Sequence, residues 1–490
     1  MSSPATHVMD RLAKEGYTMN LLNKYQFTVS YRWCCSLVIL LLISGKLAAQ
    51  VVPFCPAGNT NFTQPFKRFM PGDTGTPLLK RTLTGPNSYC NDGTRAVMYI
   101  RPANYAHNGY WRAGNGQPAI HFARWVIWLQ GGGSCRDADT CLARWCGTDG
   151  KSSSISSNMS SHNSFYAISE GGIFDRVPNN LFAGYNHVVI KYCSSDSWIG
   201  SNNLAGVPTG SSVNIDIKFQ GAAIVRDAIT TLTSMPVAAD PHPLFGFVQL
   251  PPLQGAMQIV LAGSSAGGVG VRHHLDSLKQ QLLQTSPNAV IAGVIDAGLP
   301  PVLWGPGINW ANTPTPNYAN HLIQTVLPMH AFRGTDNSAL NQDCLNPVNA
   351  AQHVADGGVY PLNCYDATYT LLKHIATPFF ISMDLNDFLP RSKYISRGFL
   401  NTQQDFVSAT QQQMLNLATV GTPQVPNPGV FAPKCNDHVR LTEGKFFRQK
   451  IRDQLSNPGH SFHDLLYSWL NGGPLPNAEI QPAGTGSICP

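Results

Sequence analysis

Five short runs of apolar residues along the chain predict buried β-strands. These runs are rich in β-branched and aromatic residues, are bounded by Gly, Asp or Asn, and cover residues 125–129, 187–192, 257–262, 289–295 and 377–383. Between them, residues 220–232 and 269–283 place apolar side chains at helical spacing. Because continuous apolar strands need cover on both faces, the pattern predicts an α/β fold with a mostly parallel sheet and helices on both faces.

Long loops are expected between several of these elements. Four stretches are rich in Ser, Pro, Gly or Asn: residues 151–162, 241–254, 299–318 and 422–433. No internal repeat and no domain linker interrupts the pattern, so residues 50–490 are expected to form a single domain with long loop insertions. Long loops on such a scaffold usually build the rim of a functional site.

The first 49 residues differ from the rest of the chain. A polar stretch with several basic residues precedes an apolar run at residues 34–45, and small residues follow at Ala48 and Ala49. This run is shorter than the roughly 20 residues that a membrane span needs. Residues 1–49 are therefore expected to be a signal peptide with a long n-region, which would make the protein secreted. The alternative is that residues 1–49 remain uncleaved and anchor the protein. Only in that case do we expect the protein to bind a membrane.

Composition excludes several classes of protein. With 43% hydrophobic and 12% charged residues, the chain can bury a large core and does not belong to the disordered class. The net charge of +6 is spread along the chain without a basic block, so no nucleic-acid partner is expected. The sequence contains no glycine-rich phosphate loop with a lysine and no dinucleotide fingerprint, and we expect no cofactor.

Cysteine usage agrees with export. The chain has 12 cysteines, and setting aside Cys34 and Cys35 of the apolar run leaves an even number. An even number in an exported chain predicts disulfides, and without a Cys-x-x-Cys pair no structural zinc site or other metal is expected. Asn61 and Asn158 begin glycosylation sequons and are expected to be exposed and glycosylated.

The segment Gly263-Ser-Ser-Ala-Gly267 carries the clearest chemical signature. It fits Gly-x-Ser-x-Gly, with a predicted strand directly before it and a predicted helix directly after it. That context is typical of a nucleophile elbow, a sharp turn that presents a serine hydroxyl above the sheet. Ser265 is therefore the candidate nucleophile. The N–H of Ala266, at the start of the helix, is a candidate donor to the oxyanion that forms after attack.

A glycine run after the first predicted strand is the candidate for the remaining oxyanion donors. The strand ends at Leu129 and continues into Gln130 and three glycines. Folds with a nucleophile elbow take a second donor from an earlier strand-to-helix loop, which is often glycine-rich because glycine lets the backbone approach the substrate oxygen. Gly132 and Gly133 are the predicted donors.

The acid and the base are less sharply defined by pattern. Elbow folds supply the nucleophile, the acid and the histidine in that chain order. Asp387, just past the fifth strand, is favoured over Asp384 on that strand's end and over Asp296 at the end of the fourth strand. Histidine candidates follow at three positions, and the pattern alone leaves them open: His438, His460 and His463.

These motifs resemble those of the pectin acetylesterase and Notum family of extracellular carboxylesterases. The resemblance spans roughly residues 88–489 and rests on the segments at residues 128–135, 192–198, 263–268, 296–298, 378–387 and 431–438. It implies an α/β-hydrolase-like catalytic domain with a triad of Ser265, Asp387 and His438. It further implies that the oxyanion donors are Gly132, Gly133 and Ala266. It also implies four disulfides and leaves Cys55 and Cys146 to pair: Cys90–Cys193, Cys135–Cys141, Cys344–Cys364 and Cys435–Cys489.

The resemblance implies a carboxylic ester hydrolase that works through an acyl-enzyme. Notum-type members carry a bulky aromatic residue after the Gly-Gly pair, where this chain has Gly133. Deacetylation of an O-acetylated polysaccharide is therefore the favoured hypothesis. One alternative is a Notum-like deacylase that removes a fatty acyl group from a secreted, lipidated protein. A second is an inactive, hydrolase-like binding protein, which the presence of serine, acid and histidine candidates argues against.

Overall fold

The structure is a computed structural model, and its described residues belong to one unit, Gln50–Pro490. The predicted signal segment 1–49 and the sequon at Asn61 lie outside the described residues. The structure describes residues 55, 66–70, 76–103, 105–106, 109–110, 123–148, 157–162, 164–234, 236–304, 308–314, 317–451, 459–482 and 489.

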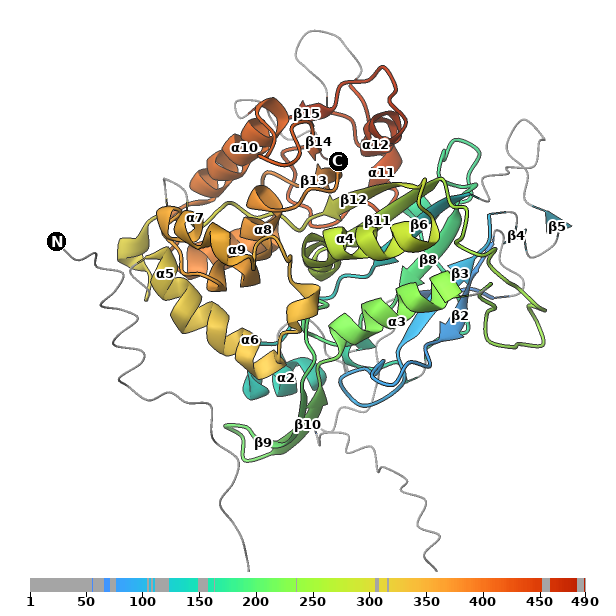
Figure 1. Cartoon of the computed structure of the whole chain (residues 1–490), viewed down its shortest axis with the longest axis horizontal. Helices are drawn as coiled ribbons and strands as arrows, with labels where there is room; N and C mark the ends of the chain where they lie inside the picture. The colour runs from blue at the N-terminus through green and yellow to red at the C-terminus, as the bar shows by residue number, and fades with distance from the viewer. Residues whose placement is uncertain are drawn as a thin grey trace, which may run out of the picture. The chain divides into compact units, whose positions relative to one another are not determined.

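One sheet of 11 strands forms the centre of this unit (Figure 1). From β8 across to β15 every neighbouring pair is parallel, whereas β1, β7, β2 and β3 form an antiparallel extension beside β8. In spatial order the strands are β1 (Lys67–Arg68), β7 (Ala167–Ser169), β2 (Leu78–Thr82), β3 (Val97–Arg101), β8 (Asn186–Ile190), β6 (Arg124–Leu129), β11 (Gln258–Ser264), β12 (Val290–Asp296), β13 (Phe379–Ser382), β14 (Gly429–Ala432) and β15 (Ala478–Ile480). Two small hairpins lie apart from it: β4 (Tyr105–Ala106) with β5 (Gly109–Tyr110), and β9 (Asn203–Pro208) with β10 (Asn214–Lys218).

Helices cover the sheet and fill the long insertion between β12 and β13. Among the described residues, no helix is both long enough and apolar enough to cross a membrane. The α-helices are α2 (Ala138–Trp145), α3 (Gly221–Ser234), α4 (Ala266–Thr285), α5 (Tyr318–His321), α6 (Leu327–Arg333), α7 (Ala350–Ala355), α8 (Ala367–Lys373), α9 (Phe388–Ser396), α10 (Gln403–Thr419), α11 (Lys445–Arg448) and α12 (Phe462–Leu470).

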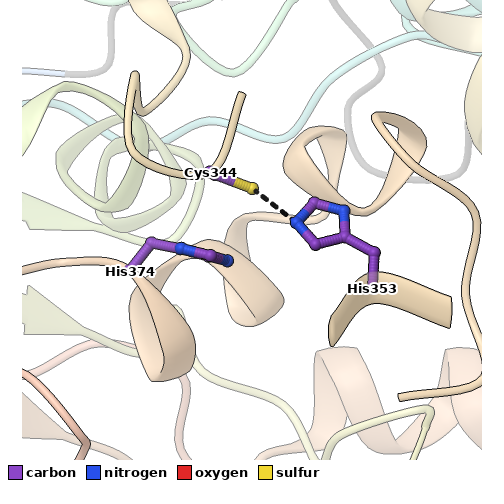
Figure 2. Close-up of side chains that lie close together, drawn as sticks. All are labelled: Cys344, His353 and His374. Carbon is purple, nitrogen blue, oxygen red and sulfur yellow. Dashed lines mark hydrogen bonds between the residues drawn. The ribbon is translucent and has the colours of Figure 1, made fainter. Parts of the chain in front are cut away.

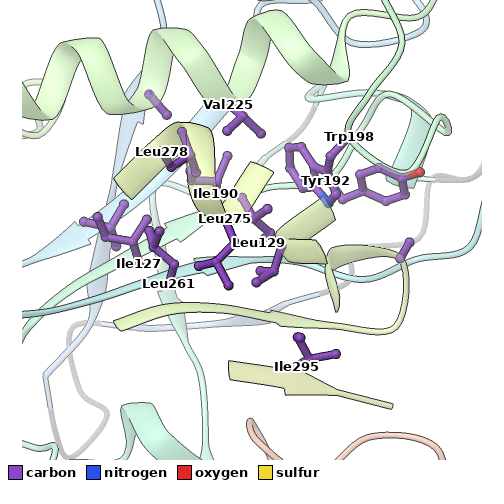
Figure 3. Close-up of a cluster of buried hydrophobic side chains, with 14 of the residues drawn as sticks. Ile127, Leu129, Ile190, Tyr192, Trp198, Val225, Leu261, Leu275, Leu278 and Ile295 are labelled. Carbon is purple, nitrogen blue, oxygen red and sulfur yellow. The ribbon is translucent and has the colours of Figure 1, made fainter. Parts of the chain in front are cut away.

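The core lies on the two faces of the sheet. Side chains of successive strand residues alternate between the faces, so Ile127 and Leu261 join one cluster while Val126 and Val260 join the other. The first cluster packs against α3, α4 and α10, and Figure 3 shows Leu275 of α4 next to the sheet residues Leu129 and Ile190. The second packs against α11 and α12. Burial on both faces explains why the parallel strands are continuously apolar in sequence.

The register of the parallel strands brings their carboxyl ends to one edge. Leu129 of β6 lies opposite Gly263 of β11, and Ser264 lies opposite Asp296 of β12. Asp296 in turn pairs with Ser382 of β13. The loops that follow β6, β11, β12 and β13 therefore leave the sheet side by side. In open α/β sheets, ligands bind at this edge.

The α/β fold with a mostly parallel sheet and helices on both faces is confirmed. All five predicted strands are present, as β6, β8, β11, β12 and β13, and the two predicted helices lie within α3 and α4. One expectation differs: the predicted loop 422–433 contains strand β14, Gly429–Ala432. This strand has only four residues and follows a Pro-rich stretch. Its apolar run is too short to predict a strand where the surrounding composition predicts a loop.

Five disulfides join the described residues and fix the loops around the sheet. The four pairs that the family resemblance implies are all present: Cys90–Cys193, Cys135–Cys141, Cys344–Cys364 and Cys435–Cys489. Cys55 and Cys146, which the resemblance left to pair, form the fifth. Disulfides form and persist in oxidising compartments, which agrees with the predicted export.

We predict that Leu275→Ala destabilises the protein strongly. Leu275 is 0% exposed, and its removal leaves a cavity between α4 and the sheet, so the free energy of unfolding should fall by about 2–5 kcal/mol. Urea unfolding of the oxidised protein measures the change. Leu244→Ala is the matched control, since Leu244 is 59% exposed and the same truncation there should change the free energy by less than about 0.5 kcal/mol. Equal losses in both variants would contradict this account of the core.

Candidate active site

Ser265 lies at a strained turn between β11 and α4. Its backbone has φ 55° and ψ −119°, a conformation that residues other than glycine rarely adopt. Such a conformation costs about 1–3 kcal/mol and persists only where the surroundings enforce it. Here the turn packs so tightly that a Cβ at Gly263 would collide with the carbonyl of Gly267, and one at Gly267 would collide with that of Leu129. The glycines of the motif are therefore a packing requirement.

A chain of hydrogen bonds links Ser265 to His438 and Asp387. The Oγ of Ser265 lies 2.8 Å from Nε2 of His438, and Nδ1 of His438 lies 2.8 and 3.0 Å from the two carboxylate oxygens of Asp387. An acceptor at Nδ1 favours the tautomer in which Nδ1 carries the proton, so Nε2 is free to accept the serine proton. The structure thus brings together the three residues that the sequence and the resemblance singled out.

The Asp387 carboxylate is held in place from a second direction. It is the N-cap of α9, and its side chain accepts the N–H of Leu389 at 3.0 Å. Burial raises the pKa of Asp387 above its usual value, and the hydrogen bonds from His438 and from the Leu389 amide act in the opposite direction. The carboxylate is fully buried, so it can orient His438 without competition from water.

The other acid and histidine candidates have different partners. Asp384 forms a buried ion pair with Arg440, with N–O distances of 2.5 and 2.6 Å. His460 pairs with Glu479 at 2.5 Å. The Nε2 of His463 accepts the N–H of Leu181 at 3.1 Å, and its Nδ1 lies 3.0 Å from a carboxylate oxygen of Asp464. Asp384, His460 and His463 therefore serve the structure around the site and make no contact with Ser265.

Asp296, the third acid candidate, positions the histidine loop. Its carboxylate accepts the backbone N–H groups of Arg440 and Leu441 at 2.9 and 3.0 Å, and the hydroxyl of Ser264 lies 3.1 Å away. These bonds fix the backbone that follows His438. The sequence pattern indicated Asp296 as a candidate acid. It could not show whether its carboxylate binds the histidine side chain or the backbone of the loop that carries the histidine.

Two side chains, Arg144 and Trp198, fix the glycine loop after β6. The guanidinium of buried Arg144 donates to the carbonyl of Gly132, and the indole N–H of Trp198 donates to the carbonyl of Gln130 at 3.2 Å. In a trans peptide the next N–H points away from the carbonyl, so the amide of Gly133 faces the side opposite Arg144. Gly132, Gly133 and Ala266 all line the same cavity as Ser265.

This cavity has a volume of about 570 Å³ and a mixed lining. Apolar walls come from residues such as Leu303, Leu389 and Phe399, but four acidic or basic side chains outside the relay also line it: Glu170, Arg272, Lys393 and Arg397. Burial, and after it the charge of Asp175, raises the pKa of Glu170 to about 8. At neutral pH the Glu170 carboxyl is therefore protonated, and the charged groups of the lining are cationic.

The second glycosylation sequon has an unexpected position. The sequence predicted an exposed Asn158, and this prediction is wrong, because the residue is half-buried. Its amide group packs so closely against Gly132 that a Cβ there would lie 2.8 Å from the Asn158 Cγ. A glycan on Asn158 would require the side chain to turn out of this position, whereas the packing makes it part of the wall behind the glycine loop.

One group among the described residues has the composition of a metal site. The candidate ligand atoms of Cys344, His353 and His374 lie within 4.8 Å of one another. Figure 2 shows the three side chains close together. The sulfur of Cys344 is bonded to Cys364, so it cannot act as a thiolate while the disulfide is intact. His374 is held by Asp343 at 2.7 Å. We therefore assign this group to the structure of the α7–α8 insertion.

We predict that Glu170 makes the stability of the protein depend on pH. Its folded-state pKa of about 8 lies above the usual value of 4.5, so the folded state binds the proton more tightly than the unfolded state. The free energy of unfolding should therefore fall between about pH 5 and pH 9, by an amount on the order of a few kcal/mol. Glu170→Gln cannot ionise and should show a smaller fall in urea unfolding across this range.

The matched control for this prediction is Glu443→Gln. The Glu443 carboxylate pairs with Lys445 near the surface, and its removal should leave the pH dependence close to that of the wild type. Parallel stability curves for the wild type and Glu170→Gln would show that the buried carboxyl does not hold its proton in this range.

Comparisons with known proteins agree with this fold and place the chain in a family. The chain is similar to the palmitoleoyl-protein carboxylesterase NOTUM of Drosophila melanogaster, with 30% identity over 230 residues that make up 46% of this chain and 28% of that protein. It is also similar to notum2 of Xenopus laevis, with 25% identity over 76% of this chain and 64% of that protein. The matches thus span less than two thirds of the length of these curated relatives.

The structural comparison extends over nearly the whole of one solved structure. The Wnt deacylase Notum from Drosophila superimposes with a TM-score of 0.55 and 22% identity, over 83% of this chain and 96% of that one, which shows a shared fold. The model of the Pectinacetylesterase family matches residues 77–481, which run from the start of β2 to the end of β15. The chain therefore belongs to the pectinacetylesterase family.

Proposed function

We propose that this protein is a secreted serine carboxylic-ester hydrolase that removes acetyl groups from an O-acetylated polysaccharide. The observation that carries the proposal is the hydrogen-bonded chain from Ser265 through His438 to Asp387 at the wall of a cavity. Membership of the pectinacetylesterase family supports the substrate class. The five disulfides support export through an oxidising compartment, with residues 1–49 as the signal peptide or as an anchor.

The proposed reaction has two halves that use the same groups. His438 takes the proton of Ser265 as its Oγ attacks the ester carbonyl, and Asp387 stabilises the imidazolium that forms. The carbonyl π electrons move to oxygen, and the tetrahedral intermediate collapses with loss of the alcohol, which receives the proton from His438. Water then attacks the acyl-enzyme with His438 as base, the carboxylic acid leaves, and Ser265 is regenerated. The steps need only side chains, backbone amides and water.

The amides of Gly132, Gly133 and Ala266 are the proposed oxyanion donors. Ala266 is the first residue of α4, so its N–H is free of helix hydrogen bonding and lies at the positive end of the helix dipole. Arg144 fixes the glycine loop from behind, so the donors are in place before the charge develops. Loss of one such donor typically slows the reaction by about 10²–10³-fold.

Acetate fits the cavity lining better than a fatty acyl group does. Arg272, Lys393 and Arg397 line the same cavity as Ser265, so a long acyl chain that filled the cavity would cover charged groups. Covering a cation with hydrocarbon costs more than the roughly 0.8 kcal/mol that each buried CH₂ contributes. The cavity volume of about 570 Å³ is nevertheless large enough for a longer chain, so deacylation of a lipidated protein, the activity in the name of the Notum relatives, is the second candidate.

We predict that Ser265→Ala abolishes ester hydrolysis while Ser264→Ala does not. Without its nucleophile the enzyme should lose at least about 10³-fold in kcat/KM on an aryl acetate. Ser264 bonds to Asp296 and to Trp128 and makes no contact with His438, so its loss should cost less than about tenfold.

A covalent label separates the two serines without reference to turnover. An aryl phosphonate should add one equivalent to the wild type and to Ser264→Ala, and none to Ser265→Ala, with the modified peptide read by mass spectrometry. Wild-type protein that neither hydrolyses aryl esters nor takes up the label would favour the inactive binding protein.

We predict a preference for short acyl groups. The wild type should hydrolyse an aryl acetate at least about tenfold better, by kcat/KM, than the aryl octanoate. Release of acetic acid from an acetylated polysaccharide, measured beside these esters, connects the preference to the proposed substrate. A reversed ratio, with octanoate preferred, would replace the polysaccharide proposal with the fatty-acyl one.

A further inference from the structure

The insertion between β12 and β13 brings two cysteines and two histidines together. Cys344 precedes α7, His353 lies on α7, Cys364 lies in the short 3₁₀ helix before α8, and His374 is the C-cap of α8. All four residues are buried, with exposed fractions of 6% or less. None of these four lines the cavity of the nucleophile. The cluster is therefore a feature of the insertion itself, separate from the proposed catalytic groups.

His353 is a buried imidazole whose ring nitrogens have no oxygen or nitrogen partner among the described residues. Its Nδ1 has no hydrogen-bond partner, and its Nε2 lies 3.9 Å from the sulfur of Cys344. The rings of Tyr360 and Tyr369 pack against it, with centroids 5.3 and 5.1 Å away, and fix its orientation. Buried polar groups without partners are rare and call for an explanation. An imidazole fixed in this way is arranged for a ligand at Nε2.

His374 supplies a second imidazole nitrogen to the same cluster. Its Nδ1 lies 2.7 Å from a carboxylate oxygen of Asp343, so the neutral ring carries its proton on Nδ1 and a lone pair on Nε2. This Nε2 is buried and has no hydrogen-bond partner. Figure 2 shows the ring of His374 extending toward that of His353, and the two ring centroids are 5.6 Å apart. Histidines that bind a metal almost always donate their other N–H to a carboxylate, a carbonyl or water, as His374 does.

Cys344 and Cys364 supply two sulfur ligands when they are thiols. Their Cα atoms are 5.8 Å apart, and each newly made chain carries both residues as thiols before the disulfide forms. Thiolate sulfur and imidazole nitrogen are the usual ligands of zinc in proteins. Zn–S bonds of about 2.3 Å and Zn–N bonds of about 2.0 Å at tetrahedral angles place sulfur and nitrogen about 3.5 Å apart. The 3.9 Å between the Cys344 sulfur and the His353 Nε2 is close to that separation.

We propose that these four side chains bind one Zn²⁺ ion while Cys344 and Cys364 are thiols, so that the metal and the disulfide are alternative cross-links of the insertion. On binding, both thiols lose their protons to solvent, and each imidazole coordinates as a neutral ring through Nε2. Two thiolates balance the charge of the ion, so the buried site is neutral overall. When the disulfide closes, the two sulfurs pass two electrons to another disulfide, which becomes two thiols, and the ion is released.

The spacing of these ligands differs from that of short zinc motifs. The run Cys344-x₈-His353-x₁₀-Cys364-x₉-His374 contains no Cys-x-x-Cys pair, so the sequence predicts no zinc site. The packing of His353 on α7 against Tyr369 on α8 brings the ligands together instead. The folded insertion, rather than one tight turn, therefore creates the cluster.

Protection of individual thiols from alkylation tests the site in the full chain. A phosphine reduces the oxidised protein, taking up oxygen from water as each disulfide becomes two thiols, and is removed before Zn²⁺ or a chelator is added. Peptide mass spectrometry then follows alkylation by iodoacetamide at each cysteine. Zinc should slow the alkylation of Cys344 and Cys364 at least about tenfold and leave Cys90, of another pair, unchanged. Equal rates with and without zinc at Cys344 and Cys364, or equal protection of Cys90, would overturn the proposal.

Cobalt(II) in place of zinc identifies the ligands by absorption. One equivalent of Co²⁺ should give the bands of a tetrahedral site with thiolate ligands in the reduced protein, and none in the oxidised protein. His374→Gln removes one ligand and should weaken binding at least about tenfold, and Asp343→Asn, which removes the charge that orients His374, should weaken it about tenfold. The matched control is His460→Gln, since His460 pairs with Glu479 outside the insertion. Undiminished affinity in His374→Gln, an equal loss in His460→Gln, or the same bands in the oxidised protein would contradict the assignment.

Discussion

One buried carboxylate, that of Asp296, holds the serine turn and the histidine loop against each other. The main-chain oxygen of Asp296 accepts the N–H of Ser265 at 2.8 Å, and its side chain accepts the N–H groups that follow His438 and contacts the hydroxyl of Ser264. Each of these donors would cost about 1–3 kcal/mol if it were left buried and unpaired. The parallel register, with Ser264 opposite Asp296, creates this arrangement as soon as β11 and β12 align.

The features that sequence predicted are those with local causes. A strand buried on both faces must be apolar along its length, so all five runs became strands. The serine was found for a similar reason, because Ser265 lies in a turn whose glycines are required by contacts within a few residues and with the neighbouring strand. Its partners are not local: His438 lies 173 residues after Ser265 and 51 after Asp387. The sequence pattern alone therefore gave several candidates for the acid and for the histidine. The resemblance to a family identified Asp387 and His438 among them.

What the sequence did not reveal depends on partners far along the chain or on short, mixed elements. Strand β14 has four residues, and β2 carries Lys80 and Arg81 within five, so neither has a clear apolar signature. Arg144 and Arg440 look like ordinary surface cations in sequence, yet both are buried and fix the loops of the site. Nothing in the spacing of charges indicates that the partner of Arg144 is a glycine carbonyl or that the partner of Arg440 is Asp384.

The charge of the cavity lining bears on the proposed acyl preference. Arg272 contributes a buried positive charge, and Glu170, the acid of the described lining, keeps its proton up to about pH 8. The charge of the lining is therefore positive at neutral pH. A fatty chain that filled the cavity would have to cover that charge with hydrocarbon, whereas an acetyl group needs only the part of the cavity at Ser265. The same burial that raises the pKa of Glu170 therefore works against a long acyl chain.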